Sequence, residues 1–242
     1  MTAAQPKPTG HYSTMVNLLM NFLLKVLIQI MFPEVLSVKY YPIIHFYGSG
    51  CSSVANCAMV KSVFWELFSA AKIFINHDLY GAALALLRHS EGIACILGTG
   101  SNSCLWDGSK IVDNVPSLGY ILGDEGSGTY IGKLLLKEIL SERVGKELTE
   151  AFYDYVQMDF TQILHKIYKD KQPNRWISNL SRFASANMEN QEIHNLIKEN
   201  FRDFLTAQIK KYSDYRDKEI SFTGSVAWHF KDILLEVMGE EN

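Results

Sequence analysis

Residues 92–112 of the chain read GIACILGTGSNSCLWDGSKIV, and this stretch decides which fold the sequence predicts. The apolar run Gly92–Leu97 predicts a buried strand, and the glycines that follow it predict a tight turn. Asn102–Trp106 predicts a second strand, and Asp107-Gly108 is a typical hairpin dipeptide before a third strand at Lys110–Val112. The sequence therefore predicts an antiparallel meander in the middle of the chain.

The residues before this meander predict a different arrangement. Strands are expected at Val38–Tyr47 and Lys72–Asn76, because both runs are rich in β-branched and aromatic residues. The spacing of apolar residues predicts helices at Ala58–Ala71 and Leu79–Leu87. This alternation of strand and helix indicates a parallel sheet with crossover helices, so we expect an α/β protein.

The residues after the meander are dense in charge and have helical periodicity from Ile131 to about Tyr215, with an interruption at Pro173-Asn174-Arg175. The chain then returns to a strand at Glu219–Phe222 and ends with an amphipathic helix. We therefore expect a disordered lead at residues 1–14, an N-terminal α/β domain at 15–89 and a C-terminal α/β domain at 90–242 with a helical insertion at about 131–215.

The composition argues against several classes of protein. With 48% hydrophobic and 20% charged residues, the 242-residue chain can bury a sizeable core. The net charge is −3, from 23 basic and 26 acidic residues, which provides no basic surface for nucleic acid or an anionic membrane. The four cysteines lack the spacing of a zinc site, and we expect them to be reduced thiols in a cytoplasmic protein.

The apolar segment Met15–Phe32 is long enough to cross a bilayer. However, polar residues recur at every fourth position, at Asn17, Asn21, Lys25 and Gln29, and would form one stripe on a helix. This pattern favours an amphipathic surface helix, and a membrane anchor is the alternative.

Three glycine-containing turns and one aspartate are the candidate functional residues. In the first turn, Gly98-Thr99-Gly100-Ser101, glycine lets backbone N–H groups approach an anion closely, and the hydroxyl groups add donors. This composition is typical of a phosphate-binding loop, but also of an ordinary hairpin turn. Another turn, Gly224-Ser225, stands between a predicted strand and a helix, whose N-terminus can face a phosphate. An ordinary strand-to-helix connection is the alternative there.

The remaining turn, Leu118–Gly128, places Asp124 and Glu125 between glycines directly before a predicted helix. These acids can cap that helix, since negative charge is favourable near its N-terminus. Alternatively, Asp124 accepts hydrogen bonds from ligand hydroxyls or reaches a metal. Asp78 also stands between a strand and a helix, where a carboxylate can take a proton from an attacking hydroxyl, cap the helix, or do both.

Together these residues resemble a known family. Asp78, ILGTGSN at 96–102, GDEGSG at 123–128 and FTGSVA at 222–227 follow one another as in the N-acetylglucosamine kinase and BadF/BadG-type ATPase family. The resemblance runs from about His45 to about Phe230 and is closest to bacterial N-acetylglucosamine kinases. It implies an actin/hexokinase-type sugar kinase with two ribonuclease H-like (actin-like ATPase) domains and a cleft between them.

The resemblance also implies ATP-dependent phosphorylation of N-acetylglucosamine at its 6-hydroxyl, with Mg²⁺ arriving with ATP and Asp78 as the catalytic base. The residues that match the family's ATP-binding positions are Gly98, Thr99, Gly100, Ser101, Gly224 and Ser225. Those that match its sugar-binding positions are Asn102, Leu118, Gly119 and Asp124. The expected partners are therefore a small amino sugar and a nucleotide.

Two departures from the family pattern lead to alternatives. No aspartate–glycine–threonine phosphate loop precedes Asp78, and the chain stops after the helix that follows the Gly224 turn, so we expect the first domain to be incomplete. One alternative is a catalytically impaired protein that binds a sugar or a nucleotide, and another is an activator-type ATPase without a sugar substrate. Apolar surface left open by the absent segments would also allow a homodimer.

Overall fold

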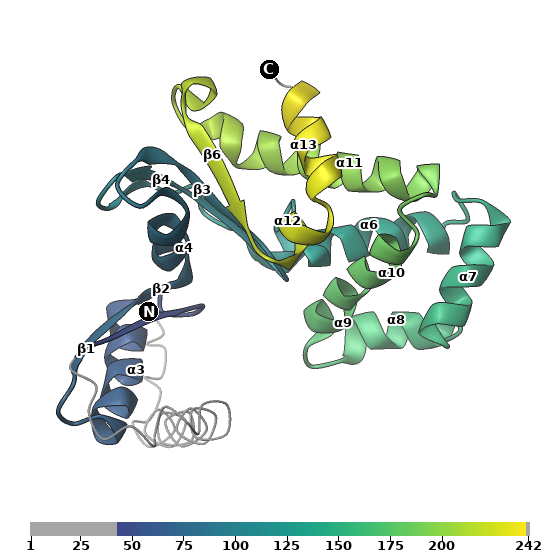
Figure 1. Ribbon diagram of the computed structural model, residues 1–242. Coiled ribbons are helices and arrows are strands. Elements are labelled where there is room, and N and C mark those ends of the chain that lie inside the picture. The colour runs from purple at the N-terminus through teal and green to yellow at the C-terminus, as the bar shows by residue number, and fades with distance from the viewer. Residues whose placement is uncertain (1–42, 241–242) are drawn as a thin grey trace, which may run out of the picture. The chain divides into compact units, whose positions relative to one another are not determined.

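The computed structural model describes residues 43–240 of the chain, which divides into two compact units, Met1–Gly81 and Ala82–Asn242 (Figure 1). The predicted lead at residues 1–14, the Met15–Phe32 helix and the beginning of the Val38–Tyr47 strand lie outside the described residues. Both units combine strands with helices, so the mixed α/β class is confirmed.

The first unit contains a two-stranded parallel sheet, as the sequence predicts. Strands β1 (Ile43–Gly48) and β2 (Lys72–His77) are connected by helix α3 (Val54–Leu67), and α4 (Asp78–Leu87) follows β2 directly. Phe64 of α3 packs with Ile73 of β2 in a small apolar core. Because Gly48 pairs with His77 in register, the two strands end at the same edge of the sheet, and Asp78 begins at that edge.

The second unit contains a four-stranded sheet in the order β5-β4-β3-β6. Strand β3 (Glu91–Leu97) pairs antiparallel with β4 (Ser101–Asp107), which pairs antiparallel with β5 (Ile111–Asp113). The predicted meander is therefore confirmed, including the turn at Asp107-Gly108, where the Asp107 carboxylate accepts from the N–H groups of Ser109 and Lys110. Strand β6 (Glu219–Thr223) returns from far along the chain and pairs parallel with β3.

Helices account for most of the second unit after β5 (Figure 1). They are α5 (Gly119–Leu122), α6 (Gly128–Leu140), α7 (Lys146–Val156), α8 (Phe160–Lys169), α9 (Pro173–Asn179), α10 (Ser181–Ala186), α11 (Gln191–Ala207), α12 (Ser225–His229) and α13 (Lys231–Glu240), with short 3-10 helices η1 (Ile209–Lys211) and η2 (Tyr215–Asp217). Pro173 interrupts the helical region because it starts α9, where a missing N–H costs nothing. Within residues 43–240, no helix is both long and apolar enough to span a membrane.

One apolar core joins the sheet of the second unit to its helices. Leu97 of β3, Ile131 of α6, and Phe201 and Phe204 of α11 are all fully buried in it. Helix α6 also packs closely on α9. Gly132 permits this approach, because a Cβ atom there would overlap the backbone carbonyl group of Ile177. The position of α9, and of the residues that follow it, therefore depends on this glycine.

We expect Gly132→Ala to lower the free energy of unfolding by about 1–3 kcal/mol, because the added methyl group would overlap the carbonyl oxygen of Ile177. Urea unfolding followed by circular dichroism would measure this loss. Gly239→Ala in α13 is the matched control, since its methyl group would meet open space and should stabilise the helix by about 0.5–1 kcal/mol. Equal stabilities for the two variants would contradict the close packing of α6 on α9.

Candidate functional site

Two of the three predicted turns are joined by hydrogen bonds at the end of β3. The turn Gly98-Thr99-Gly100 connects β3 to β4, and the first turn of α6 binds its carbonyl groups. The N–H of Gly128 donates to the Gly98 oxygen at 2.8 Å. The N–H and the hydroxyl of Thr129 donate to the Thr99 oxygen at 3.2 and 2.6 Å. Segments far apart in the sequence therefore form one rigid group.

The turn at Gly224-Ser225 reaches the same place because β6 runs parallel to β3, with Thr223 opposite Ile96. Gly224 has a φ of 109°, and a Cβ atom there would overlap the carbonyl group of Leu97. Only glycine fits this approach, and Ser225 then begins α12. All three turns thus meet beyond the carboxyl end of β3, which is where α/β proteins commonly bind ligands.

A cavity of about 550 Å³ opens beside two of these turns. Thr99 of the Gly98–Ser101 turn and Ser225 of the Gly224-Ser225 turn line this cavity. The other lining residues are Ser178, Asn179, Ser181, Arg182, Ser185, Ala186, Val226, His229 and Phe230. None of these lining residues is acidic, whereas Arg182 is a permanent cation and several others carry hydroxyl groups. Such a lining suits an anionic ligand of the size of a nucleotide.

The sequence did not lead us to the wall of this cavity formed by α9 and α10. Ser181 and Ser185 are four residues apart in α10 and share a face of it, and Ser178 lies near the end of α9; the spacing of these serines was the available signal. That signal is weak, because serines at such spacing also occur on ordinary solvent-exposed helices. Arg182, which stands beside them, gave no separate indication of a role.

Asp124 lies against the first turn and does not cap helix α6. The cap is Ser127, whose hydroxyl accepts from the Tyr130 N–H at 3.1 Å, so the capping alternative for the two acids is wrong. The Ser117 hydroxyl donates to the Asp124 carboxylate at 3.0 Å, and a Cβ atom on Gly100 would be 3.0 Å from that carboxylate. Asp124 has a positive φ of 60°, which places its side chain in this position.

The loop around Asp124 is anchored in the core by helix α11. The N–H of Gly126 donates to the amide oxygen of Asn200 at 2.9 Å, and Asn200 is fully buried. In addition, the Tyr130 hydroxyl donates to the Asp203 carboxylate at 2.7 Å. These hydrogen bonds connect the Asp124 loop and the start of α6 to helix α11.

Of the predicted residues in the second unit, Thr99 and Ser225 line the cavity and the others do not. Ser101 is buried at the start of β4. The amide oxygen of Asn102 accepts from the Ser103 N–H at 2.9 Å and from the Asn114 amide at 3.1 Å. Leu118 and Gly119 lie at the start of α5, where Leu118 is 65% exposed.

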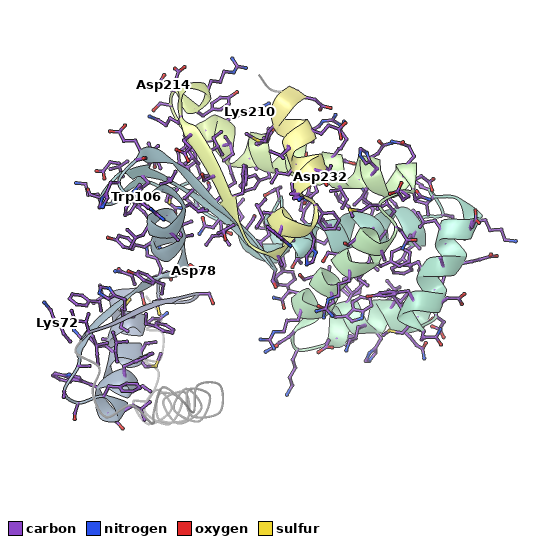
Figure 2. All side chains as sticks on the ribbon, in the orientation of Figure 1. Lys72, Asp78, Trp106, Lys210, Asp214 and Asp232 are labelled. Atoms are coloured by element: carbon purple, nitrogen blue, oxygen red, sulfur yellow. The ribbon has the colours of Figure 1, made fainter. Side chains whose placement is uncertain are left out.

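Asp78 belongs to the first unit, where it starts α4 directly after β2 (Figure 2). Its carboxylate accepts from the Leu79 N–H at 2.9 Å, and the His77 ring accepts from the Tyr80 N–H at 3.3 Å. The pKa of Cys51, in the loop after β1, is raised. The largest cause is burial, and the Cys57 thiol and the Asp78 carboxylate add to it. The negative charge of Asp78 is therefore close to that loop, at the edge where both strands end.

The chain is similar to known proteins of solved structure. No protein-family model and no curated protein matches the chain. A crystal structure from Porphyromonas gingivalis, described as a "putative N-acetylglucosamine kinase", matches with a TM-score of 0.80 and 38% identity, and covers 82% of this chain and 70% of that one. A structure from Chromobacterium violaceum with the same description matches with a TM-score of 0.59 and 24% identity over 78% of this chain and 67% of that one, which supports the fold alone.

Proposed function

Because the chain belongs to the N-acetylglucosamine kinase family, we propose that it transfers the γ-phosphoryl group of ATP to the 6-hydroxyl of N-acetylglucosamine. The observation that carries this proposal is the meeting of three glycine-containing turns, two of which line a cavity of about 550 Å³ that has hydroxyl groups, a cation and no carboxylate in its lining. In the proposed enzyme, the two units correspond to two ribonuclease H-like domains.

The nucleotide would occupy the cavity of the second unit. Thr99 and Gly100 approach the phosphates, with Gly98 and Ser101 shaping the turn, and Gly224 and Ser225 lie on the adenosine side. Arg182 adds a positive charge to attract the phosphate groups. Mg²⁺ bound to ATP would supply charge neutralisation of the transferred phosphoryl group, and phosphoryl transfer depends chiefly on such positioning and neutralisation.

The sugar would be held by the loop from Leu118 to Asp124. The Asp124 carboxylate accepts from the Ser117 hydroxyl through one of its two oxygens, so it retains lone pairs that can accept hydrogen bonds from sugar hydroxyls. Leu118 and Gly119 supply an apolar side chain and an open backbone at the start of α5, and Asn102 completes the polar side.

Asp78 would act as the general base. As the 6-hydroxyl oxygen of the sugar bonds to the γ-phosphorus, the carboxylate of Asp78 takes the hydroxyl proton, and the bond to the β-phosphate oxygen breaks to release ADP. The hydrogen bond from the Leu79 N–H uses one carboxylate oxygen of Asp78 and leaves the other oxygen to take the proton.

A coupled ADP-release assay, run with and without N-acetylglucosamine, tests the proposed function. We expect the sugar to stimulate ADP release and the product to carry phosphate on its 6-hydroxyl, as phosphorus NMR can show. ADP release that no sugar stimulates would instead indicate an ATPase without a sugar substrate. Sugar binding without turnover would indicate a protein that binds the ligands but has no kinase activity.

We expect Arg182→Ala to weaken the binding of a non-hydrolysable ATP analogue about 10-fold, because an exposed cation in the cavity lining would be lost. Isothermal titration calorimetry at low and high salt would measure this effect, which should shrink as salt screens the charge. Arg175→Ala is the control, since Arg175 lies in α9 but does not line the cavity. An equal effect of both changes would assign the loss to net charge rather than to the cavity.

A further inference from the structure

Lys133 of helix α6 connects that helix to the loop before it. Its ammonium group donates to the carbonyl oxygen of Tyr120 at 2.7 Å and to that of Gly123 at 3.0 Å. The first of these residues lies inside α5, and the second ends it. One side chain therefore binds two carbonyl groups near the C-terminal end of a single short helix.

The ammonium group of Lys133 is partly withdrawn from water. Burial lowers the pKa of Lys133, and the nearby carboxylates of Glu125 and Asp124 act in the opposite direction. The group also lies over the ring of Tyr130, 4.8 Å from its centre. Methionine has a side chain of similar length and could fill the same space without a charge. The two carbonyl groups that the ammonium group binds therefore explain why a lysine is useful here.

Helix α5 is short and leaves its large apolar side chains exposed. It has only four residues, and Leu118, Ile121 and Leu122 are 65%, 71% and 74% exposed. The N-cap residue, Leu118, has no side chain that can cap the helix. The Ser117 hydroxyl accepts a hydrogen bond from the Gly119 N–H at 3.3 Å. A segment that buries so little apolar surface opens easily unless polar contacts hold it.

We propose that Lys133 is a positioning residue that holds α5 and Gly123 in the conformation in which Gly119 and Asp124 bind the sugar. This inference rests on the proposed function, because it assumes that the Leu118–Asp124 loop is the sugar-binding loop. Lys133 itself need not touch the sugar, since it acts through the backbone of Tyr120 and Gly123. The nucleotide cavity is lined by other residues, so the two ligands should respond differently to its loss.

The test compares Lys133→Met, Lys133→Arg and the control Lys137→Met. Lys137 is exposed and lies about one turn further along the same helix. We expect Lys133→Met to raise the KM for N-acetylglucosamine 10- to 50-fold, and to leave the dissociation constant of an ATP analogue within about twofold of wild type. Lys133→Arg should recover most of the sugar affinity, because its guanidinium group can donate to both carbonyls.

Hydrogen exchange of the ligand-free protein provides a readout that does not depend on activity. We expect the amides of residues 119–123 to exchange at least 10-fold faster in Lys133→Met than in wild type or Lys137→Met, without a general rise elsewhere in the second unit. If Lys133→Met does not fold, Lys133→Gln takes its place and should show the same local change. Unchanged exchange in this loop would overturn the inference, whether or not the wild-type chain phosphorylates a sugar.

The kinetic outcomes also separate the two proposals. Equal losses of sugar and nucleotide affinity in Lys133→Met would overturn the positioning role, because they would indicate general damage to the second unit. A wild-type chain that neither binds nor phosphorylates the sugar would overturn the proposed function and the sugar-positioning role together. Faster exchange of the loop in that case would still show that Lys133 holds α5 in place.

Discussion

Replacing Asp78 with asparagine should lower sugar-stimulated ADP release by about 10²- to 10⁴-fold, which is the usual contribution of a general base. The amide has the same shape and can still accept from the Leu79 N–H, so the start of α4 should be preserved. It cannot take the proton of the sugar hydroxyl, however. The loss should therefore appear in kcat, with the KM for the sugar changed by no more than a few fold.

Asp113→Asn is a matched control for this experiment. Asp113 also accepts a hydrogen bond from the N–H of the next residue, Asn114, at 2.8 Å, and it has no proposed role in the reaction. Both variants should unfold at similar temperatures. If Asp78→Asn keeps more than a tenth of the wild-type kcat, the carboxylate is not the general base.

Replacing Gly224 with alanine should weaken the binding of an ATP analogue by more than about 30-fold. The new methyl group would overlap the carbonyl group of Leu97, which lies in a buried strand and cannot move without breaking the sheet. The positive φ of 109° adds backbone strain of about 1–3 kcal/mol for any residue other than glycine. The turn would shift away from the cavity and carry Ser225 with it.

Gly50→Ala separates strain from overlap. Gly50 also has a positive φ, of 86°, but a methyl group there would meet nothing within 4 Å. We expect Gly50→Ala to lower the melting temperature slightly and to leave the affinity for the ATP analogue, measured by calorimetry, unchanged. If Gly224→Ala binds the analogue as well as Gly50→Ala does, the approach of this turn to Leu97 has no role in ligand binding.

The elements that the sequence predicts well are those with strong local signals. The meander at Gly92–Val112 is bounded by glycines and a hairpin dipeptide, and each strand has the expected composition. Helix α3 begins at Val54, before the predicted Ala58, because the Ser53 hydroxyl accepts from the Asn56 N–H and caps it. Even this error of a few residues has a local cause.

The features that the sequence did not reveal depend on contacts between distant residues. The α9–α10 wall of the cavity is positioned by the packing of Gly132 against Ile177, which no local pattern encodes. The hydrogen bonds from Lys133 to Tyr120 and Gly123 likewise depend on how the chain reverses between α5 and α6. Asp124 suggested a cap that Ser127 provides instead, because aspartate and serine are both common N-cap residues.

Helix α6 connects the two proposed ligand sites, and this has a consequence for how the binding of one ligand affects the binding of the other. Its first turn is bonded to Gly98 and Thr99, and Lys133 on the same helix is bonded to Tyr120 and Gly123. A ligand that orders either end of α6 removes part of the conformational entropy of the protein. The second ligand then has less of this entropy to remove when it binds. Thermodynamic reciprocity then requires that, in the proposed kinase, the sugar and the nucleotide each tighten the binding of the other by the same factor.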